Sequence, residues 1–321
     1  MAIDQTPYVC RVCGSRTLGQ TVLVKEMMFG TREQFAYDQC SFCGSLQIAA
    51  IPNDDENAAA YPPGYYSFSK SNSGNVLQRL RDQAVYSSIP LPERRTSTPV
   101  EILHTVGVEK RDSILDVGCG QGLLLDRLKR IGFHTLYGCD PFIDSDYTTP
   151  AGVSVLKKRL EALSLQFDVI MFNHSFEHVP SPADTLHAVR ARLKENGICI
   201  IRIPTPTSDA FERYGAFWAQ MDAPRHMTLI SRLGMSILAK DAGFEVIKVI
   251  DDQLSWSLMA SALYSRDIPM QGAPLRQHFS WREARAFDRM AAAANARGRG
   301  DQAAFVLRAA PITQPPAGSP N

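Results

Sequence analysis

A glycine-rich turn that contains a carboxylate is the first stretch of this sequence that could bind a ligand. Residues 113–126 read Ser-Ile-Leu-Asp-Val-Gly-Cys-Gly-Gln-Gly-Leu-Leu-Leu-Asp, which predicts a buried strand, a turn and then a helix. Glycine suits such a turn because it adopts positive φ angles and lets a ligand approach the backbone closely. At the carboxyl end of a parallel sheet, a turn of this kind is where open α/β folds bind nucleotides.

Asp116 decides which kind of nucleotide this turn would bind. A dinucleotide places its pyrophosphate at the helix N-terminus, where the Asp116 carboxylate would repel it. S-adenosylmethionine has no phosphate, and its ammonium and sulfonium groups are attracted to an acid. A second acid, Asp140, ends a predicted strand about 20 residues further on, the usual distance for a carboxylate that binds ribose hydroxyls. A nicotinamide-binding domain and a turn without a ligand are the alternatives.

Four of the seven cysteines form two Cys-x-x-Cys-Gly units, Cys10 with Cys13 and Cys40 with Cys43. Each unit places two sulfurs on one tight knuckle, and two knuckles supply the four thiolates of tetrahedral zinc. We expect a structural zinc, because four protein ligands leave no coordination position for a substrate. Two disulfides would suit a secreted protein, which nothing else in the sequence indicates, and no βαβ unit surrounds the pairs as in a redox enzyme.

Side chains that could move a proton follow a predicted buried strand at 167–172. The sequence there reads His174-Ser-Phe-Glu177-His178. Methyl transfer to a hydroxyl, or to a carbon beside a carbonyl, requires a general base as well as alignment with the donor. His178, assisted by Glu177, is the predicted base; a divalent metal site and a hydrogen-bond network at a helix start are the alternatives. The zinc-protease pattern that these residues also spell needs both histidines on one helix, which Pro180 disfavours.

Residues 223–228 form a second polar stretch, Ala-Pro-Arg-His-Met-Thr, after the fifth predicted strand. This position places it at the same carboxyl edge of the sheet as the glycine turn, where ligands gather. His226 is therefore a candidate to assist His178, or to add a nitrogen ligand to a metal. The alternative is a loop whose Arg225 merely pairs with a surface acid.

Strand-like and helix-like stretches alternate through the rest of the chain, which predicts a parallel sheet with helices on both faces. We expect an α/β fold, a Rossmann-like, doubly wound sheet of seven strands. Residues 255–280 form an insertion that we interpret as an extra packed helix, with a lid as the alternative. The predicted domains are a small zinc ribbon at 1–50, a linker or aromatic clasp at 51–75, the α/β domain at 76–310 and a disordered tail at 311–321.

The composition restricts the partners. The chain has 321 residues and a formal net charge of +1, so its electrostatics imply no nucleic-acid partner. It has no run of about 18 apolar residues that would predict a membrane span, and its N-terminus lacks the pattern of a secretory signal. We therefore expect a cytoplasmic protein that acts on a small molecule; its oligomeric state is left open.

The pattern Asp116-x-Gly-x-Gly-x-Gly followed by Asp140 resembles the class I S-adenosylmethionine-dependent methyltransferases. The resemblance implies S-adenosylmethionine as the cofactor and a sheet whose last strand runs antiparallel and inserts beside the sixth. In such a site Asp116 holds the methionine end, Asp140 binds the ribose and Asn173 lies near the methionine portion. The other residues assigned to the cofactor are Gly118, Gly120, Gln121 and Gly122 at the methionine end, with Phe142 and Leu160 beside the adenine.

The zinc knuckles, the segment Phe176-Glu-His-Val and the segment Ala-Pro-Arg-His together resemble bacterial methyltransferases of sugar and surface-polysaccharide biosynthesis. That resemblance implies a saccharide acceptor, the hydroxyl of a sugar or nucleotide sugar. Phe176 stands where nucleotide-sugar C-methyltransferases carry a catalytic tyrosine, which disfavours C-methylation. Methyltransferases of ubiquinone biosynthesis and of small-RNA capping are also similar here. Some of them bind a divalent ion through Glu-x-x-Glu-His, and His174 stands in place of the first glutamate.

Two other functions are alternatives to a small-molecule methyltransferase. One is an RNA-modifying enzyme that reads RNA with the ribbon, and the other is a catalytically silent scaffold.

Overall fold

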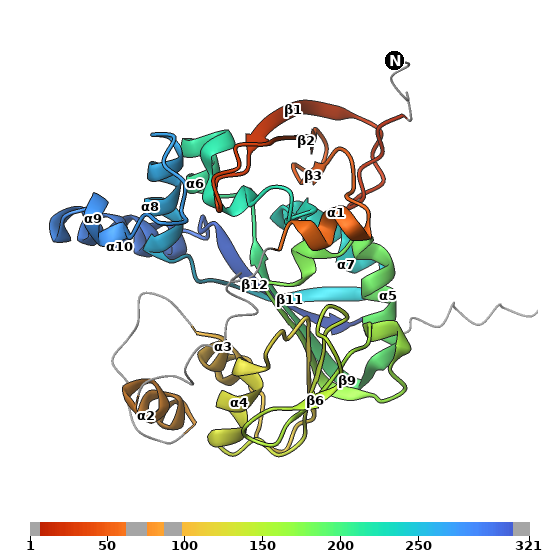
Figure 1. Ribbon diagram of the computed structural model, residues 1–321. Coiled ribbons are helices and arrows are strands. Elements are labelled where there is room, and N and C mark those ends of the chain that lie inside the picture. The colour runs from red at the N-terminus through yellow and green to blue at the C-terminus, as the bar shows by residue number, and fades with distance from the viewer. Residues whose placement is uncertain (1–6, 62–75, 87–97, 311–321) are drawn as a thin grey trace, which may run out of the picture.

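The computed structural model describes residues 7–61, 76–86 and 98–310 (Figure 1). A large mixed sheet with helices on both faces forms the α/β part, and a smaller sheet built mostly from the N-terminal strands lies beside it. Most of the expected linker or clasp, residues 62–75, lies outside the described residues. The expected tail at 311–321 lies outside them too.

The large sheet has eight strands in the order β11-β12-β9-β8-β4-β5-β7-β6. The strands are β4 (Ile114–Val117), β5 (Leu136–Cys139), β6 (Tyr147–Thr148), β7 (Ser154–Leu156), β8 (Phe167–Asn173), β9 (Leu193–Pro204), β11 (Phe244–Asp251) and β12 (Gln302–Ala309). The row from β9 to β7 is parallel, and β12 runs antiparallel to both of its neighbours. The predicted number of seven strands was wrong, because the two-residue strand β6 pairs with β7 and extends the edge.

Helices cover both faces of this sheet (Figure 1). The helices of the described residues are α1 (Asp54–Ala59), α2 (Val76–Val85), α3 (Pro99–Thr105), α4 (Leu123–Arg130), α5 (Pro182–Arg192), α6 (Asp209–Tyr214), α7 (Arg232–Asp241), α8 (Ser255–Tyr264), α9 (Leu275–His278) and α10 (Trp281–Ala296), with 3₁₀ turns η2 (Leu160–Ala162), η3 (Phe176–His178), η4 (Gly215–Phe217) and η5 (Ala219–Met221). Over the described ranges, none of these helices has the length and apolar character needed to cross a bilayer.

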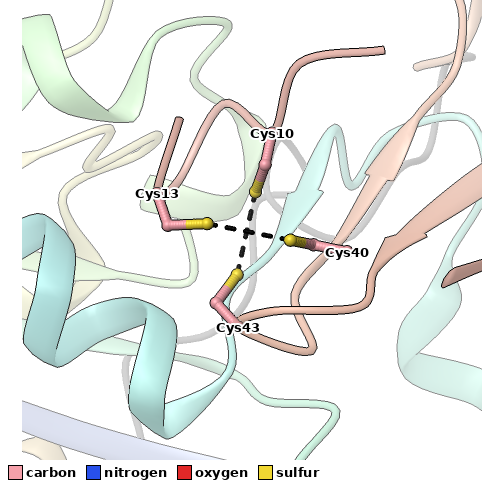
Figure 2. Close-up of side chains that lie close together, drawn as sticks. All are labelled: Cys10, Cys13, Cys40 and Cys43. Atoms are coloured by element: carbon pink, nitrogen blue, oxygen red, sulfur yellow. Dashed lines mark hydrogen bonds between the residues drawn. The ribbon is translucent and has the colours of Figure 1, made fainter. Parts of the chain in front are cut away.

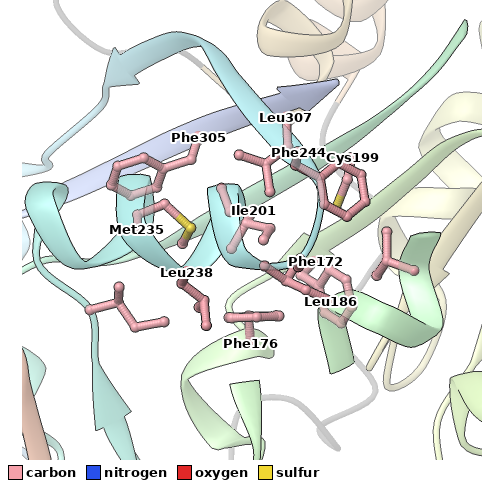
Figure 3. Packing of buried hydrophobic residues seen from close by; sticks show 14 of the residues in the cluster. Phe172, Phe176, Leu186, Cys199, Ile201, Met235, Leu238, Phe244, Phe305 and Leu307 are labelled. Carbon is pink, nitrogen blue, oxygen red and sulfur yellow. The ribbon is translucent and has the colours of Figure 1, made fainter. Parts of the chain in front are cut away.

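Alternate residues of the central strands point to opposite faces of the sheet, as strand geometry requires. In β12, Phe305 and Leu307 pack in the core with α5 and α7 (Figure 3), whereas Ala304 and Val306 pack in the core with α3 and α4. Complete burial of a phenylalanine, leucine or valine side chain contributes about 1.5–3 kcal/mol to the stability of the fold. Because both faces are covered, the strands read in the sequence as continuous apolar runs.

Two helix starts show how local side chains cap a helix. In α10, Ser280 and Glu283 form a reciprocal capping box. Ser181 is the N-cap of α5 and Pro182 follows it, but the Ser181 side chain accepts no hydrogen bond from the described helix amides. Its hydroxyl instead donates to Asp184 Oδ2 at 2.7 Å.

The small sheet joins the N-terminal ribbon to the α/β part. Its order is β1-β2-β3-β10, with β1 (Leu18–Lys25), β2 (Gln34–Cys40), β3 (Leu46–Ile48) and β10 (Thr228–Leu229). In the antiparallel pair of β3 and β10, Thr228 lies opposite Gln47 and Leu229 opposite Leu46. The strand β10 begins two residues after His226, so the ribbon and the second predicted polar stretch are joined through one sheet.

The insertion at 255–280 contains α8 and α9 and packs against neighbouring helices. Leu258, Ala260 and Leu263 of α8 are buried, and the contacts of α8 are mainly with α10 and η5. The extra packed helix that we expected here is therefore present.

Gly234 of α7 provides a test of how tightly the ribbon packs. A Cβ on Gly234 would lie 2.3 Å from Ser45 Oγ and 2.9 Å from Val12 Cγ1. Gly234→Ala should therefore lower the free energy of unfolding by about 1–3 kcal/mol in urea denaturation, although alanine alone favours a helix by about 1 kcal/mol. Ser236→Ala, on the exposed side of the same helix, should stay within about 0.5 kcal/mol of wild type. Equal effects of the two substitutions would contradict the tight contact.

Candidate active site

The glycine turn between β4 and α4 has the backbone conformation that its sequence predicts. Gly118, Gly120 and Gly122 have φ angles of 71°, 50° and 66°, in the left-handed region that other residues avoid. A Cβ on Gly118 would lie 2.5 Å from Ser175 Cβ, and one on Gly122 would lie 2.7 Å from Thr149 Cγ2. The turn therefore requires glycine for conformation and for space.

Two carboxylates lie at this turn in different environments. Asp116 leaves 3% of its surface exposed, and within the described residues its Oδ1 has no hydrogen-bond partner. Burial, with a smaller contribution from Asp140, raises the pKa of Asp116 to about 8. Asp140 accepts hydrogen bonds from the backbone N–H groups of Gly120 at 3.0 Å and Phe142 at 2.9 Å. Asp140 thus shapes the turn and keeps further lone pairs for ligand hydroxyls.

The other residues expected at the cofactor occupy varied surroundings. Phe142 leaves 54% of its surface exposed, and Gln121 is half-buried. Leu160 packs in the core on the α5 and α7 face and leaves little surface for a ligand. The Asn173 side-chain oxygen accepts a hydrogen bond from Arg202 NH1 at 3.0 Å, so part of its polar capacity is already used.

The structure brings Glu177, His178 and His226 together. One potential ligand atom of each lies within 4.8 Å of those of the other two, and the two imidazole rings meet edge to face with centroids 4.8 Å apart. His174 joins the group, with its Nδ1 3.4 Å from Glu177 Oε1. Glu177 and His178 belong to η3 and His226 to the loop before β10, so two segments distant in sequence form one cluster.

The tautomers of two histidines follow from their hydrogen bonds. His178 Nδ1 lies 2.8 Å from the backbone oxygen of Arg225 and 3.0 Å from the Tyr61 hydroxyl, and His226 Nδ1 lies 2.8 Å from the backbone oxygen of Gln220. A carbonyl oxygen only accepts hydrogen bonds, so Nδ1 carries the proton in both rings. In the neutral imidazoles, Nε2 then offers its lone pair to a proton or a metal.

Protonation in the cluster is set by burial and by its neighbours. Burial alone would raise the pKa of Glu177, but the close contact with His174 and the nearby His178 and His226 outweigh it and lower that pKa to about 2. Burial lowers the pKa of His178. At neutral pH the site therefore combines an ionised carboxylate with a neutral imidazole.

Arg225 does not pair with a surface acid, which corrects one of the interpretations of its loop. Its guanidinium bonds to Asp222 at 2.6 Å and to Glu26 at 2.8 Å, and all three side chains are almost completely buried. Burial would lower the pKa of Arg225, but the two carboxylates outweigh it and raise that pKa further. The spacing of Asp222 and Arg225 could have indicated their pairing, whereas no local signal indicates Glu26.

The four cysteines of the ribbon converge as predicted (Figure 2). The Sγ atoms of Cys10 and Cys43 are 3.7 Å apart, and so are those of Cys13 and Cys40. Gly14 and Gly44 have φ angles of 71° and 75°, which explains the glycine after each pair. Four thiolates about 2.3 Å from a zinc ion form a tetrahedron with edges of about 3.8 Å, so the spacing fits zinc.

Comparisons with known proteins agree with this geometry. The model of a family described as a methyltransferase domain matches residues 93–249. An ubiquinone biosynthesis O-methyltransferase from Cereibacter sphaeroides is 27% identical over 168 residues, which cover 46% of this chain and 68% of that protein. A protein of the same name from Xylella fastidiosa is 31% identical over 112 residues, 30% of this chain and 44% of that protein. The chain is an S-adenosylmethionine-dependent methyltransferase.

The methyltransferase also resembles solved structures at low identity. An N1-methyltransferase of 1,6-didemethyltoxoflavin from Burkholderia thailandensis, bound to S-adenosylhomocysteine, is 14% identical with a TM-score of 0.45, over 86% of this chain and 96% of that chain. An O-methyltransferase from a polyketide synthase of Brevibacillus brevis is 15% identical with a TM-score of 0.39, over 63% of this chain and 68% of that chain. Neither likeness bears on the acceptor of this methyltransferase.

Asp116 should make the stability of the cofactor-free methyltransferase depend on pH. Its pKa is raised from 3.8 to about 8, so the folded state binds more protons than the unfolded state between those values. Stability from this group is therefore present at low pH and is lost as pH rises through 8, with a slope of at most about 1.4 kcal/mol per pH unit. In urea denaturation, Asp116→Asn should gain stability relative to wild type from pH 5 to pH 8. Parallel pH profiles would show that Asp116 ionises normally.

Proposed function

We propose that this methyltransferase methylates a hydroxyl of a small molecule, and that Glu177, His178 and His226 activate that hydroxyl. The observation that supports this most directly is that these three residues converge. The cluster combines the buried, ionised carboxylate of Glu177 with two histidines whose Nδ1 atoms bond to carbonyl groups, which leaves Nε2 to act as an acceptor. The neutral imidazole of His178 beside the ionised carboxylate of Glu177 is the protonation state that general base catalysis needs. The presence of such a cluster also argues against a catalytically silent scaffold.

The cofactor site in this proposal is the glycine turn. Asp116 takes the ammonium and sulfonium end, where an unpaired buried carboxyl gains a positive partner, and Asp140 takes the ribose hydroxyls. Phe142, with its exposed ring, flanks the adenine. The remaining proposed contacts are Gly118, Gly120, Gln121, Gly122 and Asn173, with Leu160 adding only its small exposed edge.

S-adenosylmethionine supplies a methyl group on a sulfonium, which an acceptor oxygen attacks in line. The C–O bond forms as the C–S bond breaks, the electron pair stays on sulfur, and the hydroxyl proton must leave. In this protein, Nε2 of His178 or His226 accepts that proton, and the Glu177 carboxylate stabilises the resulting imidazolium. The carbonyl groups that hold both Nδ1–H groups keep the rings in the tautomer that this transfer requires.

The same residues fit a divalent cation. Glu26, Asp222 and Glu177 are three buried carboxylates against one guanidinium of Arg225, which leaves a formal charge of −2 when the histidines are neutral. Both Glu177 oxygens lack a hydrogen-bond partner within the described residues. Histidines that donate Nδ1–H to a backbone carbonyl are typical metal ligands. As the alternative to proton transfer at their Nε2 atoms, we propose that Glu177, His178 and His226 hold the ion, which would act as a Lewis acid on the acceptor.

Oxygen is the proposed methyl acceptor because the curated relatives named above are O-methyltransferases. Their names refer to ubiquinone biosynthesis and not to sugars, so the saccharide acceptor rests on the sequence resemblance alone. A screen of nucleotide sugars and of hydroxylated aromatic compounds, read by mass spectrometry for a gain of one methyl group, distinguishes the two classes. If compounds of neither class are methylated, the proposed hydroxyl acceptor of these two classes is contradicted.

Substitutions in the cluster test the proposed activation. Glu177→Gln removes the charge at nearly constant shape and should lower turnover by about 10²- to 10⁴-fold, measured as S-adenosylhomocysteine formed with the acceptor found in the screen. His226→Ala should weaken binding of Mn²⁺, followed by electron paramagnetic resonance. The control is His187→Ala, an exposed histidine on α5, which should leave both unchanged. Wild-type turnover in Glu177→Gln would remove Glu177 from the mechanism.

We also propose that the four cysteines bind one structural zinc ion. Cys13→Ser should lose one equivalent of zinc by elemental analysis and should unfold at lower temperature, because metal binding contributes folding free energy. Cys199→Ala, a core cysteine far from the knuckles in the sequence, should keep its zinc even if it is less stable. Equal zinc contents in Cys13→Ser and wild type would exclude the thiolate site.

A further inference from the structure

Residues 222–231 lie between the ribbon and η3 and are bonded to both. On the η3 side, the N–H of Met227 donates to the backbone oxygen of Glu177 at 2.8 Å. On the ribbon side, Ile48 N–H and Arg11 NH2 donate to the backbone oxygen of Met227 at 3.0 and 3.1 Å. The segment that carries His226 is thus held on two sides, and one of those sides is the N-terminal ribbon.

Tyr37 of β2 is the ribbon side chain that bonds directly to His226. It is completely buried, and its hydroxyl donates to the backbone oxygen of His226 at 2.8 Å. Burial of the hydroxyl raises its pKa beyond the usual range, so it stays a neutral donor. This bond restrains the peptide that carries the imidazole without touching the imidazole itself.

Glu26, which directly follows β1, restrains the neighbouring residue. Its carboxylate accepts the N–H groups of Phe29 and Thr31 from its own turn and bonds to the guanidinium of Arg225 at 2.8 Å. The backbone oxygen of Arg225 is the acceptor for His178 Nδ1–H. Because Glu26 is itself fixed by backbone amides, it fixes Arg225 and through it the tautomer of His178.

The zinc knuckles touch the end of the same segment. The hydroxyl of Ser231 donates to the backbone oxygen of Cys43, and Ser45 Oγ accepts the N–H of Ser231 at 3.0 Å. The pairing of β3 with β10 lies between this contact and His226. A knuckle that lost its metal would therefore release the carboxyl end of the segment as well as its own loop.

We infer that the ribbon is a structural part of the active site, with Tyr37 and Glu26 as positioning residues for His226 and His178. The inference rests on the proposed function of the Glu177, His178 and His226 cluster. It explains why the ribbon precedes this domain without assigning it a role in reading nucleic acid. It also predicts that damage to the ribbon impairs the cluster while the cofactor turn, which belongs to β4 and α4, stays intact.

The test is Tyr37→Phe in the full chain, which removes one hydroxyl and keeps the ring. Hydrogen exchange followed by mass spectrometry should show faster exchange in peptides covering 222–230 and unchanged exchange in those covering 114–122. Mn²⁺ affinity should fall by about 10- to 100-fold, the usual effect of a residue that orients metal ligands. Zinc content and S-adenosylmethionine affinity, measured by calorimetry, should match wild type. Glu26→Gln should show the same pattern.

Thr21→Val is the matched control. Thr21 Oγ1 donates to Asp38 at 2.6 Å on the exposed side of the ribbon, so its loss also removes one ribbon hydrogen bond but should leave exchange at 222–230 and Mn²⁺ affinity unchanged. If Tyr37→Phe behaves like Thr21→Val, the inference is wrong. If wild type binds no Mn²⁺, the proposed metal site fails, and hydrogen exchange at 222–230 alone decides the role of Tyr37.

Discussion

Burial of the Glu177 carboxylate is the constraint around which the cluster of Glu177, His178 and His226 is built. The side chain is completely buried, and neither of its oxygens has a hydrogen-bond partner within the described residues. An isolated ionised carboxylate would be too costly in such surroundings. His174, His178 and His226 reduce that cost because they surround the carboxylate and lower its pKa. The three histidines thus keep Glu177 ionised although it is buried.

The groups that compensate this charge come from parts of the chain that are far apart. Glu177 and His178 follow β8, and His226 precedes β10. Arg225 beside it is held between Asp222 and a glutamate of the ribbon, Glu26. The strand β10 completes the ribbon sheet. The ribbon and the cluster of Glu177, His178 and His226 are therefore linked by buried charges as well as by backbone pairing, and the boundary expected near residue 50 separates them only along the sequence.

Much of the frame could be predicted because its causes are local. Positive φ angles and close contacts require glycine at Gly118 and Gly122, so the turn is visible in the sequence. The cysteine spacing is likewise a property of each knuckle. Apolar runs in strands such as β12 reflect two covered faces of the sheet. The number of strands was missed because β6 is only two residues long and has no periodicity to detect.

The sequence by itself determined the turn, the knuckles and which side chains could carry a proton, since each depends on residue type and short spacing. Only the tertiary structure decided how those side chains are used. The proton positions on His178 and His226 depend on carbonyl groups that the fold brings to them. Tyr37 and Glu26 have no local signal at all, because their partners are 189 and 199 residues away in the chain. Contacts over such separations arise from packing of the whole protein, which no short pattern encodes.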